Sequence, residues 1–118
     1  MSAKVPDTLR LNVEHNQLTI CYGDKSYELS AEYLRVCSPS AEVRAHGGEW
    51  NIIGGKKSVR IDLIRPVGQY AVRLVFSDGH FSGIYSWEIL EDLIQNKKAY
   101  WQNYLQRLEA LGKTREQA

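Results

Sequence analysis

The chain contains very little cysteine and no long apolar run. Its two cysteines, Cys21 and Cys37, are too few to build the disulfide framework of a small secreted domain. No stretch approaches the roughly 20 apolar residues of a membrane-spanning helix. The opening residues, Met1 to Pro6, lack the apolar core of a secretory signal peptide. These absences favour a protein of the reducing cytoplasm with no membrane partner.

The chain also lacks an excess of charge of either sign. The 15 Lys and Arg residues against 14 Asp and Glu residues leave a net charge of +1, so no nucleic-acid partner is predicted. The glycine- and lysine-rich stretch 54–57 lacks the Gly-Lys-Ser/Thr order of a phosphate-binding loop. His15, His46 and His80 do not begin the His-x-Asp or His-x-Glu pair of a non-haem iron site. The sequence therefore predicts no enzyme activity and no cofactor.

What the chain does have is the composition of an ordinary globular protein. With 118 residues and an apolar fraction of 43%, it fits one domain over residues 1–118, with a core at about 8–95 and a C-terminal helix at about 97–111. Alternating patterns predict a three-stranded meander from Leu9–Val13, Leu18–Tyr22 and Ser26–Leu29. Ser30 is placed to cap a short helix over 31–35.

The remaining segments predict further strands and a helical end. A helical turn over 38–44 ended by Gly47-Gly48, a short strand over 50–53 and a strand over 59–63 broken at Pro66 come first. From Ser86 the apolar residues recur at helical spacing, with a bend at Asn96-Lys97, an end at Gly112 and a frayed tail over 113–118. The apolar stripes are Trp87, Leu90, Leu93 and Ile94, then Trp101, Tyr104, Leu105, Leu108 and Leu111. The predicted class is α+β: antiparallel strands (a meander plus a long hairpin), a short helix in the middle and a C-terminal helical segment.

Asp78-Gly79-His80 lies between two alternating runs and predicts a tight hairpin. Asp-Gly suits the two central positions of a type I′ turn, which pairs Ser77 with His80 and Phe76 with Phe81. This register predicts one core face and leaves His80 on the other face, outside the main core. The predicted core face is Tyr70, Val72, Leu74, Phe76, Phe81 and Tyr85.

Three segments together resemble one family. They are Leu34-Arg35-Val36-Cys37-Ser38-Pro39-Ser40-Ala41-Glu42-Val43, Pro66-Val67-Gly68-Gln69-Tyr70-Ala71 and Ser77-Asp78-Gly79-His80-Phe81-Ser82-Gly83-Ile84-Tyr85-Ser86-Trp87. The chain resembles the gamma-butyrobetaine hydroxylase-like N-terminal domain, a domain of unknown function, over roughly Leu9 to Leu93. The type it resembles is the stand-alone bacterial one that lacks the zinc cysteines.

The resemblance implies a degenerate zinc site. In the hydroxylases three cysteines and the histidine of the Asp-x-His turn bind a structural zinc, and here Ser38, Ser40 and Val43 stand at the cysteine positions, leaving His80. Serine and valine side chains are poor replacements for thiolate ligands, so the site is expected to hold no metal. Our hypothesis is that a neutral His80 hydrogen-bonds instead to Ser38, Ser40 or nearby backbone.

Two groups of residues remain as candidates for activity or binding. Cys37 with His80 is the one pair suited to nucleophilic catalysis, against the alternative of a buried, inert thiol. A Cys21, Cys37 and His80 metal site is a further alternative. The candidate ligand or partner surface comprises Arg44, His46, Tyr100, Trp101 and Tyr104, and its aromatic residues also suit a core or a homodimer contact through the C-terminal helix.

These observations leave two classes of function. The resemblance implies a non-catalytic accessory module whose partner is another protein, because domains of this family occur alone, in front of oxygenases and attached to P-loop iron–sulfur carrier proteins. A link to iron–sulfur or metal-enzyme assembly is the implied context. The alternative is a small-ligand-binding or catalytic protein that uses the neighbourhood of His80, Cys37 and Arg44.

Overall fold

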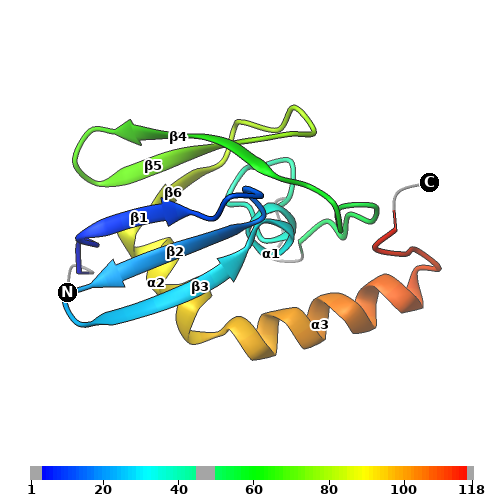
Figure 1. The fold of residues 1–118 in the computed structure, drawn as a ribbon. Coiled ribbons are helices and arrows are strands. Elements are labelled where there is room, and N and C mark those ends of the chain that lie inside the picture. Colours follow the sequence, from blue (N-terminus) through cyan, green and yellow to red (C-terminus); the bar gives the residue numbers. More distant parts are fainter. Residues whose placement is uncertain (1–3, 45–49, 117–118) are drawn as a thin grey trace.

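Two three-stranded antiparallel sheets and three helices form the fold of the computed structural model, which describes residues 4–44 and 50–116 (Figure 1). The first sheet has the order β1 (Thr8–Leu11), β2 (Gln17–Tyr22), β3 (Lys25–Ser30). The second has the order β4 (Ile61–Val67), β5 (Ala71–Phe76), β6 (Ile84–Ser86). Helix α1 (Ala31–Val36) follows the first sheet, and α2 (Trp87–Gln95) and α3 (Lys97–Ala110) follow the second. The predicted α+β class is confirmed. No helix within these residues has both the length and the apolar character needed to cross a membrane.

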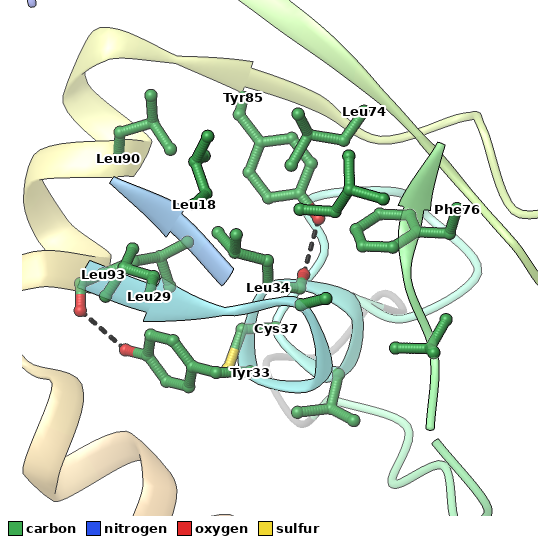
Figure 2. Close-up of a cluster of buried hydrophobic side chains, with 14 of the residues drawn as sticks. Leu18, Leu29, Tyr33, Leu34, Cys37, Leu74, Phe76, Tyr85, Leu90 and Leu93 are labelled. Carbon is green, nitrogen blue, oxygen red and sulfur yellow. Dashed lines mark hydrogen bonds between the residues drawn. The ribbon is translucent and has the colours of Figure 1, made fainter. Parts of the chain in front are cut away.

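The short helix α1 lies at the centre of the molecule. The predicted cap is confirmed, because the Ser30 hydroxyl accepts a hydrogen bond of 3.0 Å from the Tyr33 backbone N–H. Every residue of α1 is buried. Two tyrosines attach the helix to its surroundings: the Tyr33 hydroxyl donates to the Leu93 carbonyl at 2.7 Å, and the Tyr85 hydroxyl donates to the Leu34 carbonyl at 2.5 Å (Figure 2).

The core is built from both sheets and from all three helices. Because strand side chains alternate between faces, β2 directs Leu18 and Ile20 inward, and β5 does the same with Leu74 and Phe76. Leu90 on α2 is fully buried and completes this contact. Figure 2 shows Leu18, Leu74, Phe76 and Leu90 in this core, together with Leu34 of α1. The predicted meander is confirmed, with Leu18, Ile20 and Leu29 buried, but its first strand ends at Leu11 and the predicted strand residue Val13 is 94% exposed.

The turn after β5 differs from the predicted type I′ turn. The Phe76 N–H donates to the His80 carbonyl at 2.9 Å, so the loop has one more residue than predicted and Phe76 faces His80. Only Gly79 has a positive φ in this loop, whereas a type I′ turn needs two such residues. Farther along, Val72 pairs with Tyr85 as predicted. The extra residue is thus absorbed between His80 and β6.

This change of register decides which side chains are buried. His80 moves to the core side and is only 6% exposed, so its predicted place outside the core is wrong. Phe81 faces outward and is 59% exposed, so its predicted burial is wrong. Tyr70, which lies before β5, is also 59% exposed, and its predicted burial is wrong too. The other four members of the predicted core face are buried: Val72, Leu74, Phe76 and Tyr85.

Three other predicted boundaries need correction. Strand β4 runs through Pro66, which an edge strand tolerates because its N–H side needs no partner. Residues 50–53 form no strand. The predicted helix over 38–44 is reduced to one turn, in which the Arg44 N–H donates to the Ser40 carbonyl at 2.9 Å. Its predicted end at Gly47-Gly48 lies outside the described residues.

The C-terminal helices agree with their predicted boundaries. The Ser86 hydroxyl caps α2 by accepting from the Ile89 N–H, and Asn96 separates α2 from α3. Gly112 has a φ of 69° just past the end of α3, a left-handed conformation that favours glycine. Leu111 is an exception in the apolar stripe, because the helix ends at Ala110 and the side chain is 57% exposed.

The predicted frayed tail is wrong for residues 113–116. This segment lies against the loop 52–57, and the N–H groups of Gly55 and Lys57 donate to the carbonyls of Thr114 and Arg115 at 2.8 and 3.1 Å. The Arg115 guanidinium makes two hydrogen bonds of 2.8 Å to the carboxylate of Glu32, a buried residue of α1. Residues 113–116 are therefore held in place by backbone hydrogen bonds and an ion pair with two hydrogen bonds.

Candidate functional site

Three of the four predicted zinc-site positions meet at a hydrogen-bonded cluster. Ser38, Ser40 and Val43 follow α1, and His80 follows the turn after β5. The Ser38 hydroxyl oxygen lies 2.9 Å from His80 Nε2 and accepts a 3.2 Å hydrogen bond from the Ser40 N–H. Val43 is fully buried beside this turn, where its N–H donates to the Ser40 carbonyl. The hypothesis of a hydrogen bond from His80 to this segment is confirmed.

Glycine is required where β6 approaches the cluster. A Cβ atom placed on Gly83 would overlap the Ser38 hydroxyl and lie 3.2 Å from the Tyr85 ring. The absence of a side chain at this position lets the segment before β6 pack directly on Ser38. Gly83 is therefore needed for the geometry of the histidine cluster.

An ionic network surrounds the imidazole. Asp78 accepts hydrogen bonds from Arg35 Nε at 2.8 Å, from Lys56 Nζ at 2.6 Å and from the His80 N–H at 3.1 Å. Burial raises the pKa of Asp78, but these donors outweigh it and hold the pKa at about 2. Burial, reinforced by the positive charge of Arg35, lowers the pKa of His80 below its ordinary value of 6.5. A neutral imidazole at neutral pH suits the hydrogen bond to Ser38.

Ser38, His80 and Glu42 are the residue types of a hydrolytic triad, but a substrate cannot reach the serine. A Glu42 carboxylate oxygen lies 3.7 Å from His80 Nδ1, which is too long for a hydrogen bond. Ser38 is 0% exposed, so a substrate carbonyl has no route to its hydroxyl oxygen. A second set of bonds, from Ser40 to Ser82 at 2.8 Å and from Ser82 to Glu42 at 3.0 Å, continues the network to the surface. The arrangement holds two loops together.

The donor set at this cluster does not fit zinc. Two of the four positions carry hydroxyl groups, Val43 carries methyl groups, and the Nε2 of His80 is engaged by Ser38. Zinc in proteins takes thiolate, imidazole or carboxylate ligands in tetrahedral sets of four. Among residues 4–44 and 50–116, no three His, Cys, Asp or Glu side chains lie together as metal ligands.

Cys37 and His80, the predicted catalytic pair, line different depressions. His80 lines a surface depression of about 230 Å³ with Asp78, whereas Cys37 lines a groove of about 300 Å³ next to α3. Burial raises the pKa of the Cys37 thiol to about 12, so the thiol is protonated and a weak nucleophile at neutral pH. Cys21 is half-buried on β2 and is likewise a free thiol.

Arg44 has a structural role in the described structure. Its guanidinium donates to the Cys37 carbonyl at 2.9 Å and to the Ser38 carbonyl at 3.2 Å, which neutralises the carboxyl end of α1. The same group lies 4.1 Å from the centre of the Trp50 ring. His46, predicted to belong with Arg44, lies outside the described residues.

The groove beside Cys37 is a concave surface near the predicted aromatic residues. We call it the α1–α3 groove, since it lies between the end of α1, the segment that begins at Trp50, and α3. Its lining residues are Val36, Cys37, Trp50, Ile52, Tyr100, Asn103, Tyr104 and Arg107. Most of the wall is apolar or aromatic, as in typical ligand and peptide pockets.

Of the three predicted aromatic surface residues, two line this groove. The Tyr100 hydroxyl donates to the Asp92 carboxylate at 2.8 Å, and the buried Tyr104 donates to the Ile53 carbonyl at 2.6 Å. Trp101 is not among the residues that line the groove: its ring centre lies 5.2 Å from that of Tyr104 and 6.3 Å from that of Tyr33, and it lines a different depression.

Sequence reasoning did not identify Trp50, Ile52, Asn103 or Arg107 as groove residues. The α3 members carried a usable signal, because residues 100, 103, 104 and 107 follow the i, i+3, i+4, i+7 spacing of one helix face. Trp50 and Ile52 carried none, since their positions depend on a loop that packs across α3. Asp78 and Arg35 lie in the predicted turn and in a segment that resembles the family, but their contact with each other at the histidine cluster was not predicted.

Comparison with known proteins supports the resemblance. The family model described as "Gamma-butyrobetaine hydroxylase-like, N-terminal" matches residues 9–91. A protein whose structure was solved by NMR in solution is 41% identical, with a TM-score of 0.85. The match covers 99% of this chain and 94% of that protein's chain. A second protein with an NMR structure is 45% identical, with a TM-score of 0.82, and the match covers 99% of this chain and 90% of that one.

A crystal structure of a protein of unknown function from Acidithiobacillus ferrooxidans ATCC 23270, assigned to the DUF971 family, is 36% identical with a TM-score of 0.63. The match covers 75% of this chain and 91% of that one. No curated protein matches this chain. The family match and the high identity to these structures show that the chain belongs to the gamma-butyrobetaine hydroxylase-like N-terminal domain family.

Proposed function

We propose that this protein is a non-catalytic accessory module that binds another protein through the α1–α3 groove. The observation that carries the proposal is the groove itself. It is a concavity of about 300 Å³ next to an exposed helix face, and most of its described lining residues are apolar or aromatic, as in peptide-binding surfaces. Tyr and Trp side chains are enriched where proteins bind one another.

The groups that a catalytic function would need support the proposal, because they have other roles. The Cys37 thiol is protonated at neutral pH, and His80 is hydrogen-bonded to a buried serine. Arg44 is engaged by two backbone carbonyls. The alternative of a catalytic or small-ligand site built from these three residues therefore has less support than a binding surface.

The groove is also held in shape before any partner arrives. Arg44 stacks on Trp50 at 4.1 Å, and the Tyr104 hydroxyl fixes the Ile53 carbonyl at 2.6 Å. A surface that is ordered in the free protein loses less conformational entropy on binding. The family resemblance supports a partner in iron–sulfur or metal-enzyme assembly, and it gives the first place to look for one.

The experiment is a capture of partners from the native cell by the immobilised full chain. Asn103→Trp fills the groove from the exposed face of α3, and Gln102→Trp adds the same ring one residue away, outside the groove lining. We expect Asn103→Trp to reduce capture of a specific protein about tenfold, a loss of about 1.4 kcal/mol, and Gln102→Trp to retain it. Equal capture by both folded variants, judged by circular dichroism, would refute the groove as the binding surface.

A further inference from the structure

We infer that the outer face of the second sheet is a separate interaction surface, which binds an acidic, extended segment of a partner protein. Strand side chains alternate, so the burial of Leu74 and Phe76 on the core side of β5 directs its other residues outward. The strand pairing then defines the outer face as Leu63 and Arg65 of β4, Arg73 and Val75 of β5, and Ile84 of β6. This inference goes beyond the proposed function, because none of these residues lines the α1–α3 groove.

The outer face is open in the free protein. Leu63 is 47% exposed, Arg65 is exposed, and Val75 and Ile84 are partly exposed. Among the described residues that form the core or pack against it, the three apolar members of the outer face are absent. In Figure 1 the first sheet and the three helices lie on one side of β4 and β5. The other side therefore presents apolar and basic side chains to solvent.

Two positive charges stand together on this face without a counter-charge. Arg65 and Arg73 are directly opposite each other on adjacent strands. The Cβ atoms of such a pair are roughly 4.5–5.5 Å apart, and like charges in this arrangement repel. Neither guanidinium forms a hydrogen bond or an ion pair within the described part of the chain. Asp62 is the one acidic residue in the three strands, and it forms no ion pair there either.

The guanidinium of Arg73 carries a second, independent sign of a missing partner. Its Nε is shielded from solvent and has no hydrogen-bond partner among the described residues. A charged donor that is removed from water and left unpaired costs free energy. The side chain is partly exposed, so it can turn toward a bound carboxylate, whose two oxygens pair with Nε and one terminal nitrogen. The negative charge of that carboxylate also offsets the repulsion between the two arginines.

The apolar neighbours of the arginines favour a protein segment over a nucleic acid. Nucleic acids are bound by stripes of several basic residues, whereas this face has two arginines beside three aliphatic side chains, in a chain of net charge +1. In an extended segment, residues i and i+2 point the same way and lie about 7 Å apart. The pattern Asp-x-Asp-x-Leu thus brings two carboxylates to the arginines and a leucine to the aliphatic part of the face.

The test titrates the ¹⁵N-labelled full chain with three probes. The first is the blocked peptide acetyl-Asp-Ser-Asp-Ser-Leu-amide, the second replaces both aspartates by asparagine, and the third is a single-stranded thymidine dodecamer. We expect saturable shifts of the backbone signals of Leu63, Arg73 and Ile84 with the first peptide. Binding of the asparagine peptide is expected to be at least about fivefold weaker, and the dodecamer is expected to bind more weakly than the aspartate peptide.

Matched variants locate the charge effect. Arg65→Gln and Arg73→Gln are each expected to weaken binding of the aspartate peptide about three- to tenfold. Arg10→Gln removes the same charge from an exposed position opposite Thr19 and is expected to retain binding. Equal affinity for the two peptides, or no saturable binding of the first up to about 10 mM, would overturn the inference. Tighter binding of the dodecamer would also overturn it, in favour of a nucleic-acid surface.

The stability of the free protein gives a readout that needs no ligand. Because Arg65→Gln removes one of two repelling charges, we expect it to raise the midpoint of urea unfolding at low salt, and 400 mM salt to reduce the gain. Arg10→Gln has no like charge opposite it and is expected to give no such gain. A midpoint for Arg65→Gln at or below that of the wild type would overturn the argument from unpaired charge.

Failure here is distinguishable from failure of the proposed function. Asn103→Trp fills the α1–α3 groove and is expected to leave binding of the aspartate peptide unchanged. Loss of peptide binding in Asn103→Trp, with Arg65→Gln unaffected, would show that the peptide occupies the groove and would overturn the outer face as its site.

Discussion

The Ser38 hydroxyl oxygen and His80 Nε2 lie 2.9 Å apart in a part of the molecule where Ser38 is 0% and His80 is 6% exposed. The two residues are 42 positions apart in the sequence and join the loop after α1 to the loop after β5. In the hydroxylases that this domain resembles, the corresponding positions carry zinc ligands. Here a buried hydrogen bond connects the same two loops.

Removing this hydrogen bond is expected to destabilise the fold. Ser38→Ala leaves His80 Nε2 and the Ser40 N–H without their partner in a buried place, which costs about 1–3 kcal/mol of unfolding free energy. Urea denaturation followed by circular dichroism measures the loss. Ser82→Ala is the matched control: its hydroxyl is on the exposed side, and we expect a change below about 1 kcal/mol. Equal losses in the two variants would contradict a special role for Ser38.

The stability of the protein is expected to fall in mildly acidic solution because of His80. Its pKa is lowered in the folded state by burial and by Arg35, so below the ordinary pKa of 6.5 the unfolded chain takes up this proton more readily. The contribution of His80 to stability is present above pH 6.5 and is lost as pH falls toward the folded-state pKa. Asp78, with a pKa of about 2, does not titrate in this range.

The measurement is the unfolding free energy of the wild type and of His80→Gln between about pH 5 and 8. We expect the wild-type curve to rise more steeply with pH than that of the variant. His80→Asn repeats the comparison with a shorter side chain in case glutamine does not fit. Parallel curves for the wild type and both variants would show that His80 is not the titrating group.

The pair formed by Arg115 and Glu32 is expected to stabilise the end of the chain. Arg115→Ala leaves the buried Glu32 carboxylate without its two hydrogen bonds; because the Arg115 side chain is 38% exposed, we expect a loss of only about 1–2 kcal/mol. Lys57→Ala breaks the exposed pair with Glu116 and is expected to change stability by less than about 0.5 kcal/mol.

A second variant separates the ion pair from other effects at the tail. Replacing Glu32 by Gln together with Arg115→Ala removes both charges, and we expect it to recover part of the loss measured for Arg115→Ala alone. Urea is the denaturant for this comparison, because guanidinium is itself a salt and screens the interaction between charges. No recovery in the double variant would assign the effect to lost packing of Arg115 on Trp101.

Cys37 is expected to resist alkylation in the folded protein. A thiol pKa of about 12 leaves a thiolate fraction on the order of 10⁻⁴ at pH 8, and the side chain is only 2% exposed. Iodoacetamide at pH 8 is therefore expected to modify the half-buried Cys21 first and Cys37 only after unfolding in urea. Mass spectrometry of tryptic peptides measures both sites. Fast modification of Cys37 in the folded chain would revive the catalytic alternative.

The turn after β5 follows the predicted pattern of buried residues in part. Periodicity correctly predicted that Val72, Leu74, Phe76 and Tyr85 face the core, because strand side chains alternate and the apolar ones must be buried. It did not predict the length of the loop at Gly79. One additional residue exchanged the faces of His80 and Phe81, since each step along a strand reverses the direction of the side chain.

Local chemistry by itself determined the elements: the caps at Ser30 and Ser86, the end of the last helix near Gly112, and the α+β class, because hydroxyl caps and left-handed glycine act over a few residues. The contact of His80 with Ser38 was expected from the family resemblance. Tertiary structure alone placed Trp50 opposite α3 and Arg115 on Glu32, 83 positions away. Such contacts depend on how loops cross the core, and no short-range pattern of residues encodes the path of a loop through space.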